Sequence, residues 1–272
     1  MNTQQEKQVH RKAKQAHRAA KYQEPVVVKS GTPSAPVDCA CVIHGSGYDW
    51  QYVEKLYNML SRHLPMGIRF HVYTEQDRSV PPHMIKHVVK EWPGISGPKR
   101  EWWYKMQLFN SEYHAGNLLY FDLDCVIIND LSWIPALSTE CFWTIRDFRY
   151  LQRKTYSGMN SSVMWWNVSK FAHVWHEFDQ LDINRTVVKY PGDQDYLGVA
   201  IDPMQRRYFD QQHLQSWRWQ VADGGYDFAG RKPLKPGTGA SPYVGNNTSI
   251  LVFHGRPKPH EINDPVVANN WQ

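Results

Sequence analysis

The feature that most constrains the fold is an alternation of short apolar runs with helix-periodic segments in the first half of the chain. Residues 39–44 form an apolar run that ends at a Gly-Ser-Gly loop. Residues 50–64 then place apolar side chains at spacings of three and four, as one face of a helix does, and Asp49 is the candidate N-cap of that helix. Two more apolar runs, 68–74 and 118–121, flank a helix-like segment over 101–113. Strands that alternate with helices predict an α/β fold, here one Rossmann-like domain with a mixed, mostly parallel central sheet flanked by helices.

The second half of the chain continues this pattern less regularly. Apolar runs predict strands over 141–145, 162–166 and 250–253, and periodicity predicts helices over 168–180 and 193–206. In open α/β sheets, ligands bind at the carboxyl ends of the strands. Polar residues that directly follow an apolar run are therefore the first places to look for chemistry.

The charge of the chain is concentrated at its beginning. The net charge is +5, and residues 1–37 hold seven of the 31 basic residues but only two of the 26 acidic ones. Residues 38–272 hold 24 of each sign, so this part is neutral. We interpret residues 1–37 as a basic, disordered tail and linker that could touch a polyanion, and residues 38–272 as one folded domain.

Several protein classes are disfavoured by composition. No run approaches the roughly 18–20 apolar residues of a spanning helix, and the first residues lack the apolar core of a signal peptide. The cysteines form no C-x-x-C pair, so neither a zinc ribbon nor a redox motif is indicated. They are Cys39, Cys41, Cys125 and Cys141. The sequence therefore predicts a cytoplasmic protein with reduced cysteines and no transmembrane segment.

The first motif with chemical meaning is residues 118–124, LLYFDLD. The apolar run predicts a buried strand that delivers Asp122 and Asp124 where it ends. Two buried carboxylates are costly unless a charge neutralises them. Carboxylate oxygens suit Mg²⁺ or Mn²⁺, which keep open positions for phosphates. The pair therefore indicates a divalent metal site, although a solvated or helix-capping loop pair has the same pattern.

The second motif is residues 250–259, ILVFHGRPKP, in which an apolar run again ends in polar residues. His254 could complete a metal site as a neutral imidazole, and Lys258 could neutralise a phosphate. A histidine at the end of a strand is also compatible with an ordinary hydrogen-bonded role.

Two further motifs are each compatible with a purely structural role. Residues 157–167, SGMNSSVMWWN, have the pattern of a turn followed by a core strand. Residues 191–195, PGDQD, begin a predicted helix, where acidic residues cap the helix and complement its dipole. Capping does not explain Gln194.

Together and in this order, the four motifs resemble glycosyltransferases of the GT-A fold, and most closely the glycosyltransferase family 8 type. That family carries a strand-borne D-x-D, here 122–124, with a basic residue on the preceding helix, a place that Lys105 takes here instead of the usual arginine. It also has an N-x-G-V-type segment, here 160–163, a D-Q-D segment, here 193–195, and a His/Gly/Lys-Pro segment, here 254–259. The resemblance spans about residues 39–262.

The resemblance implies a metal-dependent enzyme that moves a sugar from a nucleotide-sugar, a UDP-sugar above all, to a hydroxyl acceptor with retention of configuration. It implies Mn²⁺ rather than Mg²⁺, held by Asp122, Asp124 and His254. By the same resemblance, the donor-binding residues are His44, Gly45, Lys105, Asp122, Asn160 and Lys258, and the residues at the reacting centre are Gln194, Asp193 and Asp195.

Two departures from the family pattern mark the chain as a divergent member. The histidine and lysine of the last motif are four positions apart instead of six, which puts the contact of Lys258 with a phosphate in doubt. Ser162 also stands where the family commonly has a glycine, which could narrow the sugar pocket.

Two other functions are compatible with parts of the sequence. Residues 122–126 also fit the D-x-D-x-[TV] loop of haloacid-dehalogenase-like phosphohydrolases, with Asp122 as nucleophile, although these enzymes carry the loop near the start of the domain. The 12 Trp and 15 Tyr would also suit a non-catalytic protein that binds carbohydrate or nucleic acid. The region 217–245 is irregular and rich in Gly and Pro, which predicts an acceptor-facing loop.

The acceptor itself is left open by the residues. A saccharide, a lipid-linked glycan, a protein or a modified nucleic acid could each supply the hydroxyl. The neutral body argues against a large nucleic-acid footprint.

Overall fold

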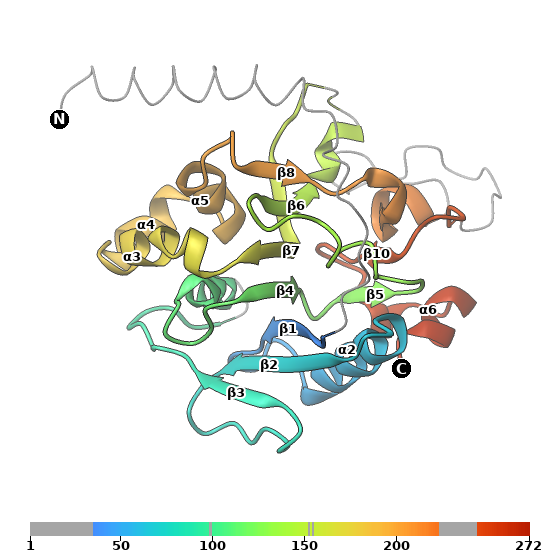
Figure 1. The fold of residues 1–272 in the computed structure, drawn as a ribbon, viewed down its shortest axis with the longest axis horizontal. Helices are drawn as coiled ribbons and strands as arrows, with labels where there is room; N and C mark the ends of the chain where they lie inside the picture. The colour runs from blue at the N-terminus through green and yellow to red at the C-terminus, as the bar shows by residue number, and fades with distance from the viewer. Residues whose placement is uncertain (1–34, 98–99, 152, 154, 223–243) are drawn as a thin grey trace.

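The computed structural model describes residues 35–272 apart from 98–99, 152, 154 and 223–243. Its main sheet has seven strands in the order β3-β2-β1-β4-β7-β6-β8 (Figure 1). These strands are β1 Val37–Val42, β2 Ile68–Thr74, β3 Ile85–Val88, β4 Asn117–Phe121, β6 Phe142–Arg146, β7 Met159–Asn167 and β8 Arg206–Tyr208. A second, three-stranded sheet has the order β5-β10-β9, with β5 Cys125–Ile127, β9 Leu214–Ser216 and β10 Ile250–Val252.

Helices and helical turns connect these strands. The α-helices are α2 Trp50–His63, α3 His173–Asp179, α4 Ile183–Lys189, α5 Asp193–Ala200 and α6 Pro265–Asn270. The 3₁₀ helices are η1 Glu101–Phe109, η2 Phe148–Leu151, η3 Ser169–Phe171, η4 Gln211–His213 and η6 Pro259–Glu261, and η5 Trp217–Val221 is a π-helix.

The main sheet is mixed and mostly parallel, as the sequence predicts. β3, β2, β1 and β4 run parallel to one another, and β8 runs parallel to β6. Only β7, among the described strands of this sheet, runs against its neighbours β4 and β6. As a result, β7 begins at the edge of the sheet where β1 and β4 end.

Alternate residues of the central strands face two hydrophobic cores. In β1, Cys39 and Cys41 face a core shared with α2 and the small sheet, whereas Ala40 faces a core shared with η1, α3 and α5. β4 and β7 alternate in the same way. Because side chains point to opposite faces at every second position, one strand can serve both cores.

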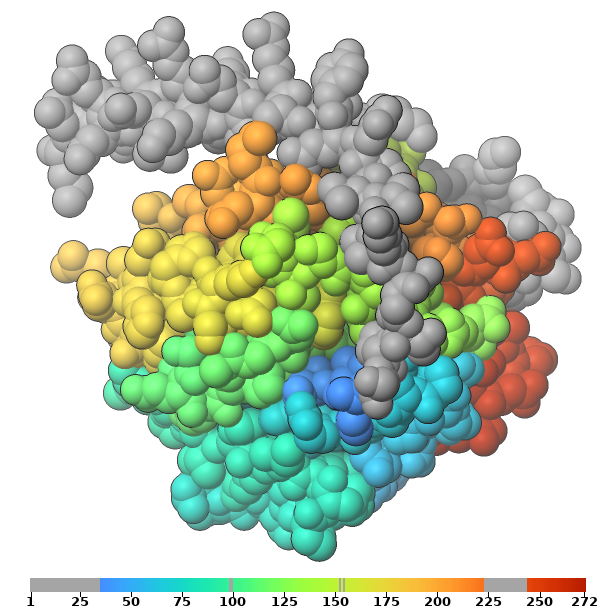
Figure 2. Space-filling model, in the orientation of Figure 1, coloured from blue at the N-terminus to red at the C-terminus, as the bar shows by residue number. Residues whose placement is uncertain are grey.

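The C-terminal helix packs against the first helix of the domain. α6 (red) lies beside α2 (blue to cyan) at the surface of the molecule (Figure 2). The rings of Tyr52 and Trp271 meet edge to face with their centroids 5.1 Å apart. The predicted N-cap of α2 is confirmed, because the carboxylate of Asp49 accepts a hydrogen bond from the amide of Gln51 at 2.9 Å.

Several element boundaries differ from the predicted ones. The segment predicted as a helix over 101–113 is a 3₁₀ helix that ends at Phe109, because Asn110 is extended. The segment 168–180 divides into η3 and α3. The helix predicted to reach residue 206 ends at Ala200, since Pro203 disfavours a helical Asp202 and Arg206 already pairs with β6.

Some predictions fall on parts of the chain outside the described residues. Almost all of the predicted tail and linker, residues 1–34 of 1–37, lies there, and so does most of the predicted acceptor-facing loop, residues 223–243. Of that loop, Trp217 is described, and its ring is buried against Phe253 with centroids 5.1 Å apart. No helix within the described ranges has the length and apolar character needed to cross a membrane.

Candidate active site

A pocket of about 510 Å³ opens at the edge where β1 and β4 end and β7 begins. It is lined by Val42, Ile43, His44, Gly47, Tyr48, Glu101, Trp102, Lys105, Tyr120, Asp122, Leu123, Asp124, Asn160, Ser161, Ser162, Asp193, Gln194, His254, Gly255, Arg256 and Lys258. The four sequence motifs, which are far apart along the chain, therefore meet at one place. This is the position that the strand-end rule predicts for a ligand site.

The small sheet brings Asp124 and His254 to the same end of the pocket. β5 and β10 are antiparallel, with Cys125 opposite Val252, so the residue before β5 lies near the residues that follow β10. β9 runs parallel to β10, with Ser216 opposite Val252. The hydroxyl of Ser216 thereby reaches Nε2 of His254 at 2.7 Å.

The pairing of β4 with β7 places Asp122 beside the 160–162 segment. Phe121 lies opposite Val163, and the amide of Asp122 donates to the carbonyl of Ser162 at 2.7 Å. The side chain of Ser162 also helps to lower the pKa of Asp122. Ser162 is thus a hydrogen-bonding neighbour of the D-x-D motif.

Lys105 is the centre of a buried charge network. Lys105 belongs to η1. Asp122 lies two residues after Tyr120, so its side chain emerges on the face of the sheet that packs against η1. The Lys105 ammonium lies 2.7 Å from Oδ1 of Asp122 and 3.5 Å from Oδ2 of Asp193. The hydroxyl of Ser161 donates to Oδ2 of Asp193 at 2.6 Å, and that of Tyr120 donates to Oδ1 of Asp122 at 2.6 Å.

The network fixes the protonation of its two central groups. Burial alone would raise the pKa of Asp122, but the Lys105 charge and the hydrogen bonds hold it below its usual value. Burial alone would lower the pKa of Lys105, but Asp122 and Asp193 raise it. Both groups are therefore charged at neutral pH, and the pair is a fixed dipole in the wall of the pocket.

The second carboxylate of the D-x-D motif has a different partner. Asp124 forms an ion pair with the ammonium of Lys258, and its Oδ2 accepts a hydrogen bond from the hydroxyl of Tyr48 at 2.9 Å. Lys258 also donates to the Tyr48 hydroxyl at 2.8 Å. Burial, together with the nearby charge of Asp122, raises the pKa of Asp124 although Lys258 opposes the shift. Of the two D-x-D carboxylates, Asp124 is therefore the one whose ionised form would be stabilised more by an additional positive charge.

His254 is held as a neutral imidazole. Its ring is stacked on Phe148 with centroids 5.4 Å apart and meets Trp219 edge to face at 4.9 Å. Burial lowers its pKa to about 4, with smaller contributions from the positive charges of Arg218, Lys258 and Arg149. At neutral pH the ring keeps a nitrogen lone pair, which is the state that binds metals.

Most residues predicted for the site line the pocket, and two do not. Gly45 and Asp195 are absent from the lining. Gly45 adopts a positive φ of 62° close to the side chain of Glu101. Asp195 lies in the first turn of α5, where its amide donates to the carbonyl of Gly192 at 3.1 Å.

Sequence reasoning missed several residues that contact the site. Tyr48, Ser161 and Ser216 bond directly to predicted site residues. Glu101 and Arg256 line the pocket without having been singled out. Trp102 also lines it, although its apolar spacing predicts a core position. Ser161 lies inside the 157–167 motif, and Tyr48 directly follows the Gly-Ser-Gly loop. The three-residue strand β9, by contrast, carries no pattern that points to Ser216.

The three predicted metal ligands share one pocket but do not converge on a point. The ligand atoms of Asp122, Asp124 and His254 do not all lie within 4.8 Å of one another. Each ligand contacts a different protein partner. Asp122 pairs with Lys105, Asp124 pairs with Lys258, and His254 contacts Ser216. The chemistry of the set, two carboxylates and a neutral imidazole, nevertheless suits a divalent cation. The Lys258 ammonium now supplies the positive charge beside Asp124 that a bound cation would supply.

The fold is similar to those of solved glycosyltransferases at low sequence identity. An active-site mutant of LgtC aligns with a TM-score of 0.56 and 14% identity over 86% of this chain and 93% of that chain. The galactosyltransferase LgtC in complex with donor and acceptor sugar analogs aligns with a TM-score of 0.53 and 15% identity over 86% of this chain and 96% of that chain. The glycosyltransferase GlyE from Streptococcus pneumoniae TIGR4 aligns with a TM-score of 0.53 and 15% identity over 83% of this chain and 56% of that chain.

No protein-family model and no curated protein sequence matches the chain. The structural likenesses therefore establish the fold, which is GT-A-like. This confirms the fold class that the sequence predicts.

Proposed function

We propose that residues 38–272 are a metal-dependent glycosyltransferase domain that moves a sugar from a nucleotide-sugar, a UDP-sugar above all, to a hydroxyl acceptor with retention of configuration. The observation that supports this most is the meeting of both D-x-D carboxylates, His254, Lys105 and Lys258 in one pocket of a GT-A-like fold. A sugar diphosphate needs positive charge at its leaving group, and the pocket combines lysines with candidate cation ligands.

A divalent cation, Mn²⁺ in this proposal, would be held by Asp122, Asp124 and His254. When bound, it would act as a Lewis acid that neutralises the charge developing on the departing diphosphate. Binding requires Lys258 to leave Asp124, since its ammonium now neutralises that carboxylate. The freed Lys258 is then available to a phosphate oxygen, which is the role that the shortened His–Lys spacing left in doubt.

The other side chains bind and orient the sugar. Oδ1 of Asn160 accepts from the amide of Ser162 at 3.0 Å, and we assign the NH₂ group of this pocket-lining side chain to a sugar hydroxyl. Asp193 is fixed by Lys105 and Ser161 and offers its remaining acceptor capacity to sugar hydroxyls. We assign Gln194 a position beside the reacting face and no covalent role. His44 and the loop after it would hold the nucleotide.

The donor site is tested by thermal unfolding with UDP, GDP and ADP, each with and without Mn²⁺. A ligand at a hundred times its dissociation constant stabilises a protein by about 2.7 kcal/mol. At about 2–4 °C per kcal/mol, this raises Tm by roughly 5–10 °C for a domain of this size. We expect that shift with UDP only when Mn²⁺ is present. Absence of any nucleotide shift would favour the phosphohydrolase or the non-catalytic binding protein.

Ser216 is proposed to position His254. If Nε2 of His254 carries the proton, it donates to the Ser216 hydroxyl and leaves the Nδ1 lone pair for a metal. Ser216→Ala should then weaken Mn²⁺ affinity about 10-fold to 100-fold, as the loss of such outer partners does. Isothermal titration with Mn²⁺ in the presence of UDP measures this effect. Ser132→Ala, which removes an exposed hydroxyl, is the control, and equal affinities for all three proteins would contradict the role.

A further inference from the structure

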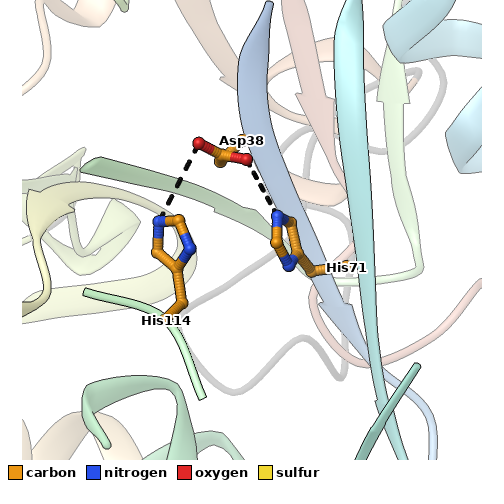
Figure 3. A group of neighbouring side chains, drawn as sticks. All are labelled: Asp38, His71 and His114. Carbon is orange, nitrogen blue, oxygen red and sulfur yellow. Dashed lines mark hydrogen bonds and ion pairs between the residues drawn. The ribbon is translucent and has the colours of Figure 1, made fainter. Parts of the chain in front are cut away.

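A second cluster with metal-ligating chemistry lies outside the pocket. Asp38 belongs to β1, His71 to β2, and His114 to the segment just before β4 (Figure 3). One carboxylate oxygen and two imidazole nitrogens of these residues all lie within 4.8 Å of one another. Among the described residues, this is the one group of three His, Cys, Asp or Glu that meets such a spacing.

The sheet places the cluster away from the donor site. Asp38 is the second residue of β1, whereas the pocket begins at Val42 where that strand ends. Asp38 lies on the same side of β1 as Ala40, and His71 lies on the same side of β2 as Tyr73. Both side chains therefore emerge on one face of the sheet, where His114 also points toward Asp38 (Figure 3).

The separations suit a small divalent ion. His71 Nε2 lies 2.9 Å from Asp38 Oδ1, and His114 Nε2 lies 3.9 Å from Asp38 Oδ2. A tetrahedral zinc ion with bonds of about 2.0–2.1 Å holds its ligand atoms roughly 3.3 Å apart. The two observed distances fall on either side of that value. These two distances end on different oxygens of Asp38, and Nε2 of His114 also lies 3.2 Å from the carbonyl oxygen of Asn117. The His114 side chain therefore has to turn away from that carbonyl before one oxygen and both imidazole nitrogens can surround an ion.

The two imidazoles are shielded from solvent, and a third histidine can orient one of them. The side chains of His71 and His114 are 6% and 13% exposed. Nε2 of His87 lies 2.9 Å from Nδ1 of His71. If Nδ1 of His71 donates a hydrogen bond to His87, Nε2 of His71 is left as the metal ligand.

Arg69 already pairs with Asp38, and this pairing leaves capacity for an ion. Its Nε and terminal nitrogen donate to Oδ1 and Oδ2 of Asp38 at 2.6 and 2.5 Å. A carboxylate offers about four lone-pair sites, so each oxygen can still face the imidazoles. The Arg69 side chain is 56% exposed and can remain as an outer partner or turn to solvent.

We propose that Asp38, His71 and His114 bind a zinc ion that clamps β1, β2 and the segment before β4, with water as the fourth ligand. Two imidazoles and one carboxylate suit Zn²⁺ better than the hard cations that prefer all-oxygen sites. Because its three ligands come from segments that are distant in sequence, the bound ion would stabilise the folded chain. The proposal is independent of the glycosyltransferase assignment.

Cobalt titration of the metal-free, untagged full chain tests the zinc site, because Co²⁺ in a tetrahedral site absorbs visible light. We expect one equivalent of Co²⁺ to give a tetrahedral spectrum, one equivalent of Zn²⁺ to remove it, and Zn²⁺ to raise Tm. His114→Asn should lose the spectrum and the shift. The matched control His176→Asn removes an exposed histidine of α3 and should keep both. Asp124→Asn, which changes the donor site, should also keep both.

Three results would overturn the zinc proposal. The first is no tetrahedral spectrum with wild type at excess Co²⁺, and the second is a spectrum that survives in His114→Asn. If His114→Asn does not fold, X-ray absorption at the zinc edge of the wild type decides. A zinc coordination shell of two imidazole nitrogens and oxygen ligands would support the proposal. A coordination shell that contains sulfur, or only oxygen, is the third contrary result.

Discussion

Asp124→Asn is expected to reduce sugar transfer by about 10²–10³-fold or more, the size of effect seen when one electrostatic contact to a developing charge is removed. Asparagine keeps the shape of the side chain but removes the charge that would hold the cation. The fold should survive, since Lys258 is partly exposed and can turn to solvent once its partner is neutral. Transfer rates and Mn²⁺ affinity of the two proteins measure the effect.

The matched control for this variant is Asp179→Asn. Asp179 lies on α3, where it forms a partly exposed ion pair with Lys90, and it does not line the pocket. Its transfer rate should equal that of the wild type. A fully active Asp124→Asn protein that still needs Mn²⁺ would contradict the assignment of Asp124 to the metal.

Lys105→Met is expected to give the largest loss of stability, about 3–5 kcal/mol, as for buried ion pairs from which one partner is removed. Lys105 is 8% exposed, and two acidic partners, Asp122 and Asp193, depend on its charge. At about 2–4 °C per kcal/mol, Tm should fall by roughly 6–20 °C. Urea denaturation and calorimetry measure the change.

Lys258→Met is the comparison for Lys105→Met, because it removes the charge from the other D-x-D carboxylate. Its cost should be smaller, since the Lys258 side chain is 22% exposed and Asp124 keeps its bond to Tyr48. Asp124 also has a raised pKa and can take up a proton more easily than Asp122. The double variant Lys105→Met/Asp122→Asn should recover part of the stability lost in Lys105→Met. Equal losses in the two lysine variants would contradict the central place given to Lys105.

The sequence predicts the site residues that directly follow a strong apolar run. Asp122 and His254 are examples, because a buried strand fixes where its next residue emerges. The helix N-cap at Asp49 is predicted for a similar reason, since the apolar periodicity of the following helix locates its start. These features depend on local patterns, which a single sequence displays.

Features that depend on pairing between distant segments escape such prediction. Ser216 reaches His254 only because the three-residue strand β9 pairs with β10 in one register. The contact of Lys105 with Asp193 depends on how η1 and α5 pack on the same face of the sheet. Asp38 and His71 come together through the parallel pairing of β1 with β2. No local sequence pattern predicts these contacts.

The most direct test of the account is ³¹P NMR of UDP-sugars incubated with the wild type and Asp124→Asn, with and without Mn²⁺. Water can serve as a slow acceptor, so the test does not require the natural one. The account predicts release of UDP from at least one UDP-sugar by the wild type with Mn²⁺, and loss of that release in Asp124→Asn. Release of inorganic phosphate in place of UDP, or no cleavage of any UDP-sugar, would contradict it.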